Sequence, residues 1–143
     1  MEPRISLITL GVSDLAAAKE FYESVLGWQA APGPPEIVFF DLGGLIFSLY
    51  PHEKLAEDMN KSAGKGDGYG GYALAHNVAS IEQVDQIFTD LKQKGANIVK
   101  EPETAFWGGY SGYFADPDGN QWEVAFNPYW TILEDGRISM EKK

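Results

Sequence analysis

The sequence contains one pattern twice, and this repeat limits what the chain can fold into. In the first copy, an apolar run at residues 5–12 is followed by apolar positions at helical spacing, and both features recur 66 residues later. The first helical set is Leu15, Ala18, Phe21, Tyr22 and Val25, and the second is Ile81, Val84, Ile87, Phe88 and Leu91. Each copy therefore predicts a strand followed by an amphipathic helix.

Capping residues at both ends support the two helices. Ser13 or Asp14 is a suitable N-cap for the first helix, and Ser80 is one for the second. Gly27 and Gly95 follow the last apolar positions, where glycine commonly ends a helix. These residues mark where each predicted helix begins and ends.

Three short strand-like segments follow each helix, separated by turn residues. They lie at residues 28–31, 37–42 and 45–50 in the first copy, and at 97–100, 112–116 and 121–126 in the second. The pattern predicts an α+β fold built from two tandem βαβββ modules. We place module one at about 4–51, a glycine-rich loop linker at 52–71, module two at about 72–128 and a C-terminal tail at 129–143, all within a single domain 1–143.

Composition excludes several classes of function. The formal net charge of -10 disfavours nucleic acid and anionic membrane surfaces as partners, and the absence of cysteine removes thiolate metal sites and a cysteine nucleophile. The apolar run 5–12 is too short to span a bilayer, and Glu2 does not suit a signal peptide. We therefore expect a cytoplasmic location.

Two sets of motifs point to a family. Residues 10–15 (LGVSDL), 21–22 (FY) and 25–28 (VLGW) lie in module one, and residues 114–124 (FADPDGNQWEV) lie in module two. In this order they resemble the vicinal oxygen chelate superfamily, which comprises glyoxalases, bleomycin-resistance proteins and extradiol dioxygenases. The resemblance covers about residues 4–128. It implies a glyoxalase-like fold in which the modules form an incomplete barrel with the site on its concave side, commonly in a homodimer.

The resemblance also implies where metal ligands would lie. Members that use a metal carry ligands on the first and last strand of each module, and these positions are Leu7, Ser48, Ala73 and Glu123 here. Only Glu123 is a good ligand, whereas a divalent transition metal needs about three protein ligands. We therefore expect no catalytic metal and no other cofactor, a divalent metal being the alternative. Glu123 is the candidate catalytic residue, and the equal alternative is a carboxylate inherited from a metal-binding ancestor and now bonded internally.

Neither histidine falls at one of these positions. His76 is an odd number of residues from Ala73 on the same expected strand, so we expect it on the opposite, helix-covered face as a structural residue. His52 follows the last strand of module one, and the sequence does not determine whether it approaches a cavity.

Strand alternation predicts which side chains line the concave face. They are Leu7, Thr9, Ser48, Tyr50, Ala73, Ala75, Asn77, Gln121 and Glu123. The segment 106–113 adds Trp107, Tyr110 and Tyr113 at the cavity mouth, although aromatic residues at turns also serve packing or a dimer contact. By the same alternation, Trp122, Val124 and Phe126 belong in the core under the helices, and the apolar tail should pack on the fold or on a dimer partner.

The predicted pocket is partly apolar with few polar groups, which suits a small organic ligand. The first hypothesis is a metal-independent small-molecule binder, in the manner of the antibiotic-sequestering members of the family. The alternative is a glyoxalase-like lyase, isomerase or dioxygenase that uses Glu123 as a metal ligand or general base, with Tyr110 or Tyr113 as a hydrogen-bond donor. A protein-interaction module without small-molecule chemistry is the third.

Overall fold

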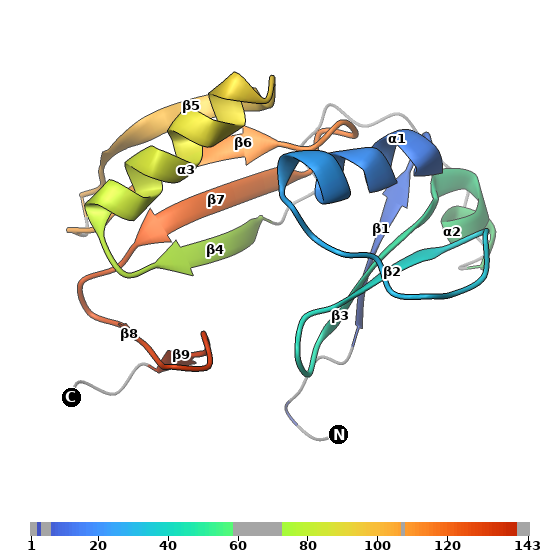
Figure 1. The fold of residues 1–143 in the computed structure, drawn as a ribbon, viewed down its shortest axis with the longest axis horizontal. Helices are drawn as coiled ribbons and strands as arrows, with labels where there is room; N and C mark the ends of the chain where they lie inside the picture. Colours follow the sequence, from blue (N-terminus) through green and yellow to red (C-terminus); the bar gives the residue numbers. More distant parts are fainter. Residues whose placement is uncertain (1–2, 4–6, 59–72, 107, 140–143) are drawn as a thin grey trace. The chain divides into compact units, whose positions relative to one another are not determined.

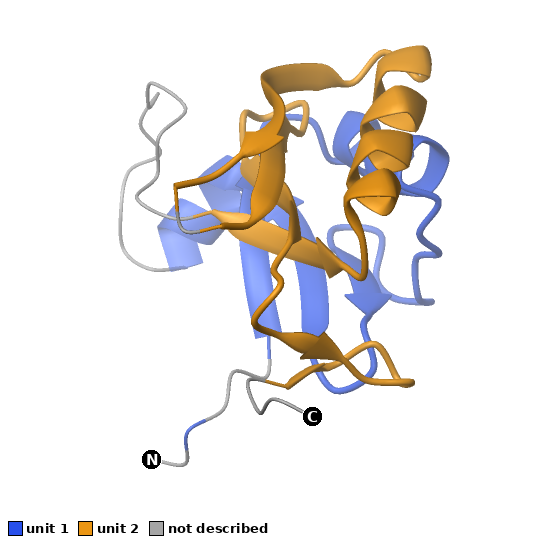
Figure 2. Ribbon diagram, turned by 90° about the vertical axis from the view of Figure 1, so that its left-hand side faces the viewer, with its two compact units in different colours: residues 1–67 blue, residues 68–143 orange. Residues whose placement is uncertain are grey.

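The structure is a computed structural model that describes residues 3, 7–58, 73–106 and 108–139. The chain divides into two compact units, unit 1 (Met1–Asp67) and unit 2 (Gly68–Lys143), which Figure 2 shows in blue and orange. The boundary between the two units lies within the segment 52–71, where the repeat places the linker between its copies.

Unit 1 is a small open sheet with helices (Figure 1). Its elements are β1 (Leu7–Val12), α1 (Leu15–Glu20), the π-helical turn η1 (Phe21–Val25), β2 (Val38–Asp41), β3 (Ile46–Pro51) and α2 (His52–Asp58). The strand order is β1-β3-β2, with β1 parallel and β2 antiparallel to β3.

Unit 2 contains a complete copy of the predicted module. Its elements are β4 (Leu74–Val78), α3 (Ile81–Gln93), β5 (Asn97–Thr104), β6 (Tyr110–Ala115), β7 (Gln121–Phe126), β8 (Thr131–Ile132) and β9 (Ile138–Ser139). The four-stranded sheet has the order β4-β7-β6-β5, and α3 lies over one face of it (Figure 1). With open sheets in both units, the chain has the mixed α+β fold that the repeat predicts.

The helix ends form where the sequence predicts them. The Asp14 side chain accepts a hydrogen bond from the Ala17 backbone N–H at 2.9 Å and caps α1, while Ser80 caps α3. Gly27 and Gly95 have φ angles of 75° and 76°, a left-handed conformation that other residues adopt at a cost. The two glycines therefore allow the chain to turn away after each helix.

The core of unit 1 is an aromatic cluster under the first helix. Tyr22 is fully buried, and its ring centroid lies 5.1 Å from that of Phe47 and 5.8 Å from that of Phe40. Trp28 joins the same cluster, 5.6 Å from Phe40. The expected strand at 28–31 is wrong, because Trp28 turns inward and only Ala31 forms an isolated bridge, to Phe39.

The core of unit 2 lies between α3 and the sheet. Val84, Phe88 and Leu91 of α3 are buried, as predicted from their helical spacing. Gly112 of β6 faces them, since a Cβ on this residue would lie 2.7 Å from Phe88 Cζ and 2.8 Å from the Lys100 carbonyl oxygen. The absence of a side chain at residue 112 thus allows the helix to approach the sheet closely.

The linker between the modules and the C-terminal tail both contain secondary structure. The expected loop linker at 52–71 begins with helix α2 (His52–Asp58), so that part of the prediction is wrong, and residues 59–71 lie outside the described ranges. The tail forms the β8–β9 hairpin, in which Thr131 pairs with Ser139. Within the described ranges, no helix has the length and apolar character needed to cross a membrane.

Candidate functional site

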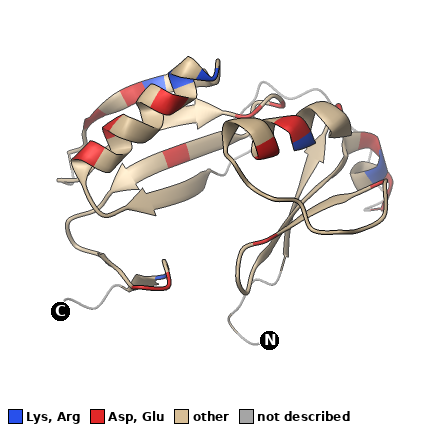
Figure 3. Ribbon diagram, in the orientation of Figure 1, with Lys and Arg blue, Asp and Glu red and all other residues tan. Residues whose placement is uncertain are grey.

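A row of four side chains crosses one face of the sheet in unit 2. Glu123 of β7 lies opposite Tyr113 of β6 and opposite Ala75 of β4, and Tyr113 in turn lies opposite Lys100 of β5. Residues that pair across strands project to the same face. Figure 3 shows the acidic segment of β7 within an otherwise uncharged strand, while charges of both signs occur on α3 and β5. We call Ala75, Glu123, Tyr113 and Lys100 the Glu123 row.

Three members of the Glu123 row, namely Glu123, Tyr113 and Lys100, interact electrostatically. Tyr113 and Glu123 lie directly opposite each other in the β6–β7 pair, and the negative charge of Glu123 acts on the Tyr113 hydroxyl. Desolvation raises the pKa of Tyr113 above its ordinary value, the negative charge of Glu123 raises it further, and the positive charge of Lys100 opposes both. The Lys100 ammonium forms an ion pair with Glu103 at 2.7 Å, and this contact raises the pKa of Lys100.

The remaining predicted residues of unit 2 lie before, after or beside this row. Gln121 starts β7 and donates a hydrogen bond to the Gly119 carbonyl at 3.3 Å. Ala73 is exposed and precedes β4. Asn77 lies two residues after Ala75 in β4, on the same face, and is opposite Ala125 instead of Glu123. There it lines a pocket together with residues of the C-terminal tail. Gln121 and Asn77 therefore share the face but lie at opposite ends of it.

The aromatic segment divides between the two faces of the sheet. Tyr113 lies on the face of Glu123, as predicted. Tyr110 does not, because its hydroxyl donates a hydrogen bond to Asp85 Oδ1 of α3 at 2.7 Å, on the helix-covered face. The expectation that Tyr110 lines the cavity is wrong, and strand alternation from Tyr113 explains the difference. Trp107 lies outside the described residues.

Unit 1 carries its predicted polar pair. The Thr9 and Ser48 hydroxyl oxygens lie 2.6 Å apart, and Ser48 is 0% exposed. Leu7 is 47% exposed on the same face of β1, whereas Leu10 and Val12 on the other face are buried. The alternation predicted for β1 is thus confirmed.

His52 lies closer to this face than the sequence could show. A Cβ on Gly11 would be 2.6 Å from His52 Nδ1, so the imidazole packs directly against the backbone of β1. Gly11 lies two residues after Thr9 in β1, so the two residues share a face of the sheet. Tyr50 lies opposite Gly11 in the β1–β3 pair. His52 and Tyr50 are therefore neighbours of Gly11, on the face that also carries Thr9 and Ser48. The glycine at position 11 was the sequence signal for this close approach.

His76 behaves as a structural residue of the other face. It lies opposite Val124, which is buried under α3, so its side chain projects toward the helix as predicted. Although part of the residue reaches solvent at the edge strand, burial lowers the pKa of the imidazole below its ordinary value.

The residues at the family's ligand positions do not fit a divalent transition metal. Leu7 and Ala73 offer no donor atom, and the Ser48 hydroxyl is already hydrogen-bonded to Thr9. Glu123 alone supplies a carboxylate, and within the described ranges no three His, Cys, Asp or Glu side chains gather closely enough to hold a metal.

The Asp116 carboxylate is committed to a turn. It accepts hydrogen bonds from the backbone N–H groups of Asp118 and Asn120, both at 2.9 Å, and from Asn120 Nδ2 at 2.8 Å. This network confirms the tight turn that the segment 116–120 predicts.

Comparison with known proteins decides the family. The family model of the Glyoxalase/Bleomycin resistance protein/Dioxygenase superfamily matches residues 4–124. The chain belongs to this superfamily.

Individual relatives of the superfamily agree in fold and extent. The crystal structure of a glyoxalase-related enzyme from Fulvimarina pelagi is similar with a TM-score of 0.85 and 34% identity, covering 96% of this chain and 98% of that chain. An uncharacterized protein, YraH of Bacillus subtilis, is 30% identical, covering 82% of this chain and 93% of its own length. The metallothiol transferase FosB of Bacillus licheniformis is 29% identical, covering 84% of this chain and 73% of its own length.

Proposed function

We propose that this member of the superfamily binds a small organic molecule through the Glu123 row, without a catalytic metal. The observation that carries the proposal is the cross-strand pairing of Tyr113 with Glu123, on the face of the unit 2 sheet opposite α3. The Glu123 carboxylate lies between the Tyr113 phenol and the small, exposed side chain of Ala75, so a ligand group can approach it from the Ala75 side.

Charge and shape favour a cationic aromatic ligand. Glu123 supplies a negative charge, Tyr113 supplies an aromatic face, and both residues are half-buried. An ammonium group near a tyrosine ring gains a cation–π interaction, which adds to its attraction to the carboxylate. The nearest cation, Lys100, pairs with Glu103 and is exposed, so a ligand ammonium does not have to displace it. The net charge of -10 increases the local concentration of cations in the same direction.

A thermal-shift experiment tests this proposal. Benzylamine should raise the melting temperature of the wild type, and the increase should be the same with EDTA or with added Zn²⁺, Mn²⁺ or Ni²⁺. Glu123→Gln and Tyr113→Phe should reduce the increase. Glu57→Gln is the matched control, because it removes one exposed carboxylate from α2 in unit 1 and leaves the row intact. A shift that needs metal, or an equal shift in Glu123→Gln, would contradict the proposal.

The alternative is a glyoxalase-like lyase, isomerase or dioxygenase. The Glu123–Tyr113 pair favours it, because a carboxylate with a neighbouring phenol can accept a proton and then stabilise the developing charge. The similarity to a glyoxalase-related enzyme and to a metallothiol transferase supports an enzymatic role as well. Elemental analysis of the purified protein separates the mechanisms: stoichiometric transition metal supports Glu123 as a ligand, and metal-free turnover lost in Glu123→Gln supports a general base.

A further inference from the structure

A pocket of about 260 Å³ lies between the ends of β4 and β7 and the C-terminal hairpin, all within unit 2. Its lining consists of Asn77, Val78, Ala79, Phe126, Asn127, Trp130, Thr131, Ile132 and Ile138. None of the members of the Glu123 row contributes to it, so it is a separate place on the molecule. We call it the tail pocket. We propose that the tail pocket binds a neutral, planar molecule that carries a carboxamide or lactam edge.

The polarity of the lining argues for a neutral ligand. None of the described residues that line the tail pocket is charged, so an ion bound there would lose water without gaining a counter-charge. Phe126, Ile132 and Ile138 add apolar groups to the lining. This combination excludes the cationic ligand proposed for the Glu123 row.

Two carboxamides give the pocket its recognition groups. Asn127 Oδ1 accepts a hydrogen bond from the Tyr129 backbone N–H at 2.9 Å, which holds this side chain in place and leaves its NH₂ group as a donor. Asn77 makes no side-chain hydrogen bond to any residue within the described ranges. An amide or lactam has adjacent donor and acceptor groups, which complement the donor and acceptor of an asparagine.

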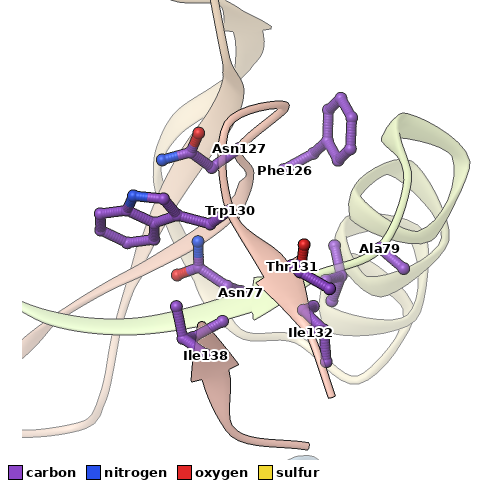
Figure 4. A pocket seen from close by; sticks show the side chains of 9 residues that line it. Asn77, Ala79, Phe126, Asn127, Trp130, Thr131, Ile132 and Ile138 are labelled. Carbon is purple, nitrogen blue, oxygen red and sulfur yellow. The ribbon is translucent and has the colours of Figure 1, made fainter. Parts of the chain in front are cut away.

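Trp130 adds a flat surface beside these amides. In Figure 4 the side chains of Asn127 and Asn77 lie on either side of Trp130, and Ile138 projects from the neighbouring hairpin strand. Trp130 is 40% exposed, so its indole is available to a planar ligand. Its backbone N–H donates to the Asn127 carbonyl at 3.3 Å, which ties it to the same turn.

The volume limits the ligand to a small ring. Drug-sized ligands occupy pockets of roughly 300–1,000 Å³, and the tail pocket lies just below that range. A single aromatic ring with one amide group suits this space. Such a small ligand has few atoms with which to gain affinity, so a dissociation constant on the order of 1 mM is expected.

Titration by NMR with benzamide as the probe tests the proposal. Benzamide should shift the side-chain NH₂ signals of Asn77 and the indole N–H signal of Trp130, and the shifts should saturate. Benzoate, which has the same shape and a negative charge, should bind at least about tenfold more weakly. N,N-Dimethylbenzamide, which lacks N–H donors, should also bind more weakly. Absence of saturable shifts with benzamide, or equal binding of benzoate, would overturn the proposal.

Variants locate the binding in the tail pocket. Asn77→Leu keeps the side-chain size and should weaken benzamide binding about tenfold, while Trp130→Phe should bind better than Trp130→Leu. Asn97→Leu, on the exposed β5 strand at the other edge of the sheet, is the matched control and should bind like the wild type. Dispersed amide spectra and unchanged melting temperatures show that each variant is folded. Equal binding by Asn77→Leu and the wild type would overturn the proposal.

Glu123→Gln separates this proposal from the proposed function. Benzamide binding should be unchanged in Glu123→Gln, since the carboxylate does not line the tail pocket. If benzamide binds and benzylamine does not, the proposed function of the Glu123 row is rejected and the tail-pocket proposal stands. Loss of benzamide binding in Glu123→Gln would assign the probe to the Glu123 row and overturn the tail pocket.

Discussion

Tyr113 and Glu123 lie directly opposite each other in the β6–β7 pair, and the negative charge of the Glu123 carboxylate acts on the Tyr113 phenol. The pairing brings a proton donor and an acceptor to one face of a sheet whose other face is covered by α3. Because the charge of Glu123 acts on the phenol, the protonation of Tyr113 reports that charge.

Glu123→Gln should lower the pKa of Tyr113. Desolvation raises that pKa most and the charge of Glu123 raises it further, so removal of the charge should lower it. Lys100→Met should raise the pKa of Tyr113, because the positive charge of Lys100 lowers that pKa in the wild type. Tyrosine ring signals followed by carbon-13 NMR against pH measure both changes.

Tyr110 is the internal control for this titration. Its hydrogen bond to Asp85 raises its pKa, and Asp85 lies on α3 at the other face of the sheet. Asp85→Asn should therefore lower the pKa of Tyr110, and Glu123→Gln should leave it as in the wild type. A Tyr113 pKa that is unchanged in Glu123→Gln would show that the two residues are not coupled in solution.

Gly112→Ala should destabilise the protein by about 1–3 kcal/mol, as overpacking of a tight core does. The new methyl group would meet Phe88 Cζ at 2.7 Å and the backbone of β5, at the Lys100 carbonyl oxygen, at 2.8 Å. Denaturant unfolding followed by circular dichroism measures the loss.

Gly33→Ala is the control for this substitution. Its Cβ would meet only the Phe39 ring, at 3.2 Å, and the residue is exposed, so the change in unfolding free energy should be clearly smaller. Equal effects of Gly33→Ala and Gly112→Ala would contradict the close approach of α3 to β6.

His76 should make the folded protein less stable as the solution becomes acidic. Burial lowers its folded-state pKa below the ordinary value of 6.5, so between the two values the unfolded chain binds more protons. The contribution of neutral His76 to the unfolding free energy is therefore fully present above about pH 7.5, and it is lost as the pH decreases through 6.5 toward the folded-state pKa.

The comparison of His76→Gln with the wild type isolates this effect. Urea unfolding at about pH 7.5 and about pH 5.5 should show a smaller loss for the variant on acidification. An identical loss in both proteins would mean that His76 is as well solvated in the folded chain as in the unfolded one.

The Thr9–Ser48 hydrogen bond should contribute measurably to the stability of unit 1. The two oxygens are 2.6 Å apart and Ser48 is fully buried, so Ser48→Ala should cost about 1 kcal/mol. A double-mutant cycle with Thr9→Val should give a coupling energy of roughly 0.5–1.5 kcal/mol.

Ser24→Ala provides the exposed comparison for that cycle. Ser24 donates a hydrogen bond to Glu20 at 2.7 Å on the solvent side of the first helix, where water replaces the lost contact. Its effect should be much smaller than that of Ser48→Ala. Purely additive effects of Thr9→Val and Ser48→Ala would contradict a direct bond between the two hydroxyls.

Much of the candidate site could be predicted because strand alternation is a local property. Thr9, Ser48, Tyr113 and Glu123 lie on the expected faces, since successive side chains point to opposite sides of any strand. The position of Tyr110 was not predicted correctly, because its glycine-rich surroundings predict a loop, to which strand alternation does not apply. The structure extends β6 back to Tyr110, and alternation then explains its position.

The sequence by itself determined the repeated modules, the helix caps and the buried face of each helix. All of these depend on residues close together in the chain or on the identity of single side chains. Only the tertiary structure decided that Trp28 turns into the core, that His52 packs on Gly11 and that the tail forms a pocket with Asn77. These contacts depend on which distant segments pack together, which periodicity along the chain does not encode.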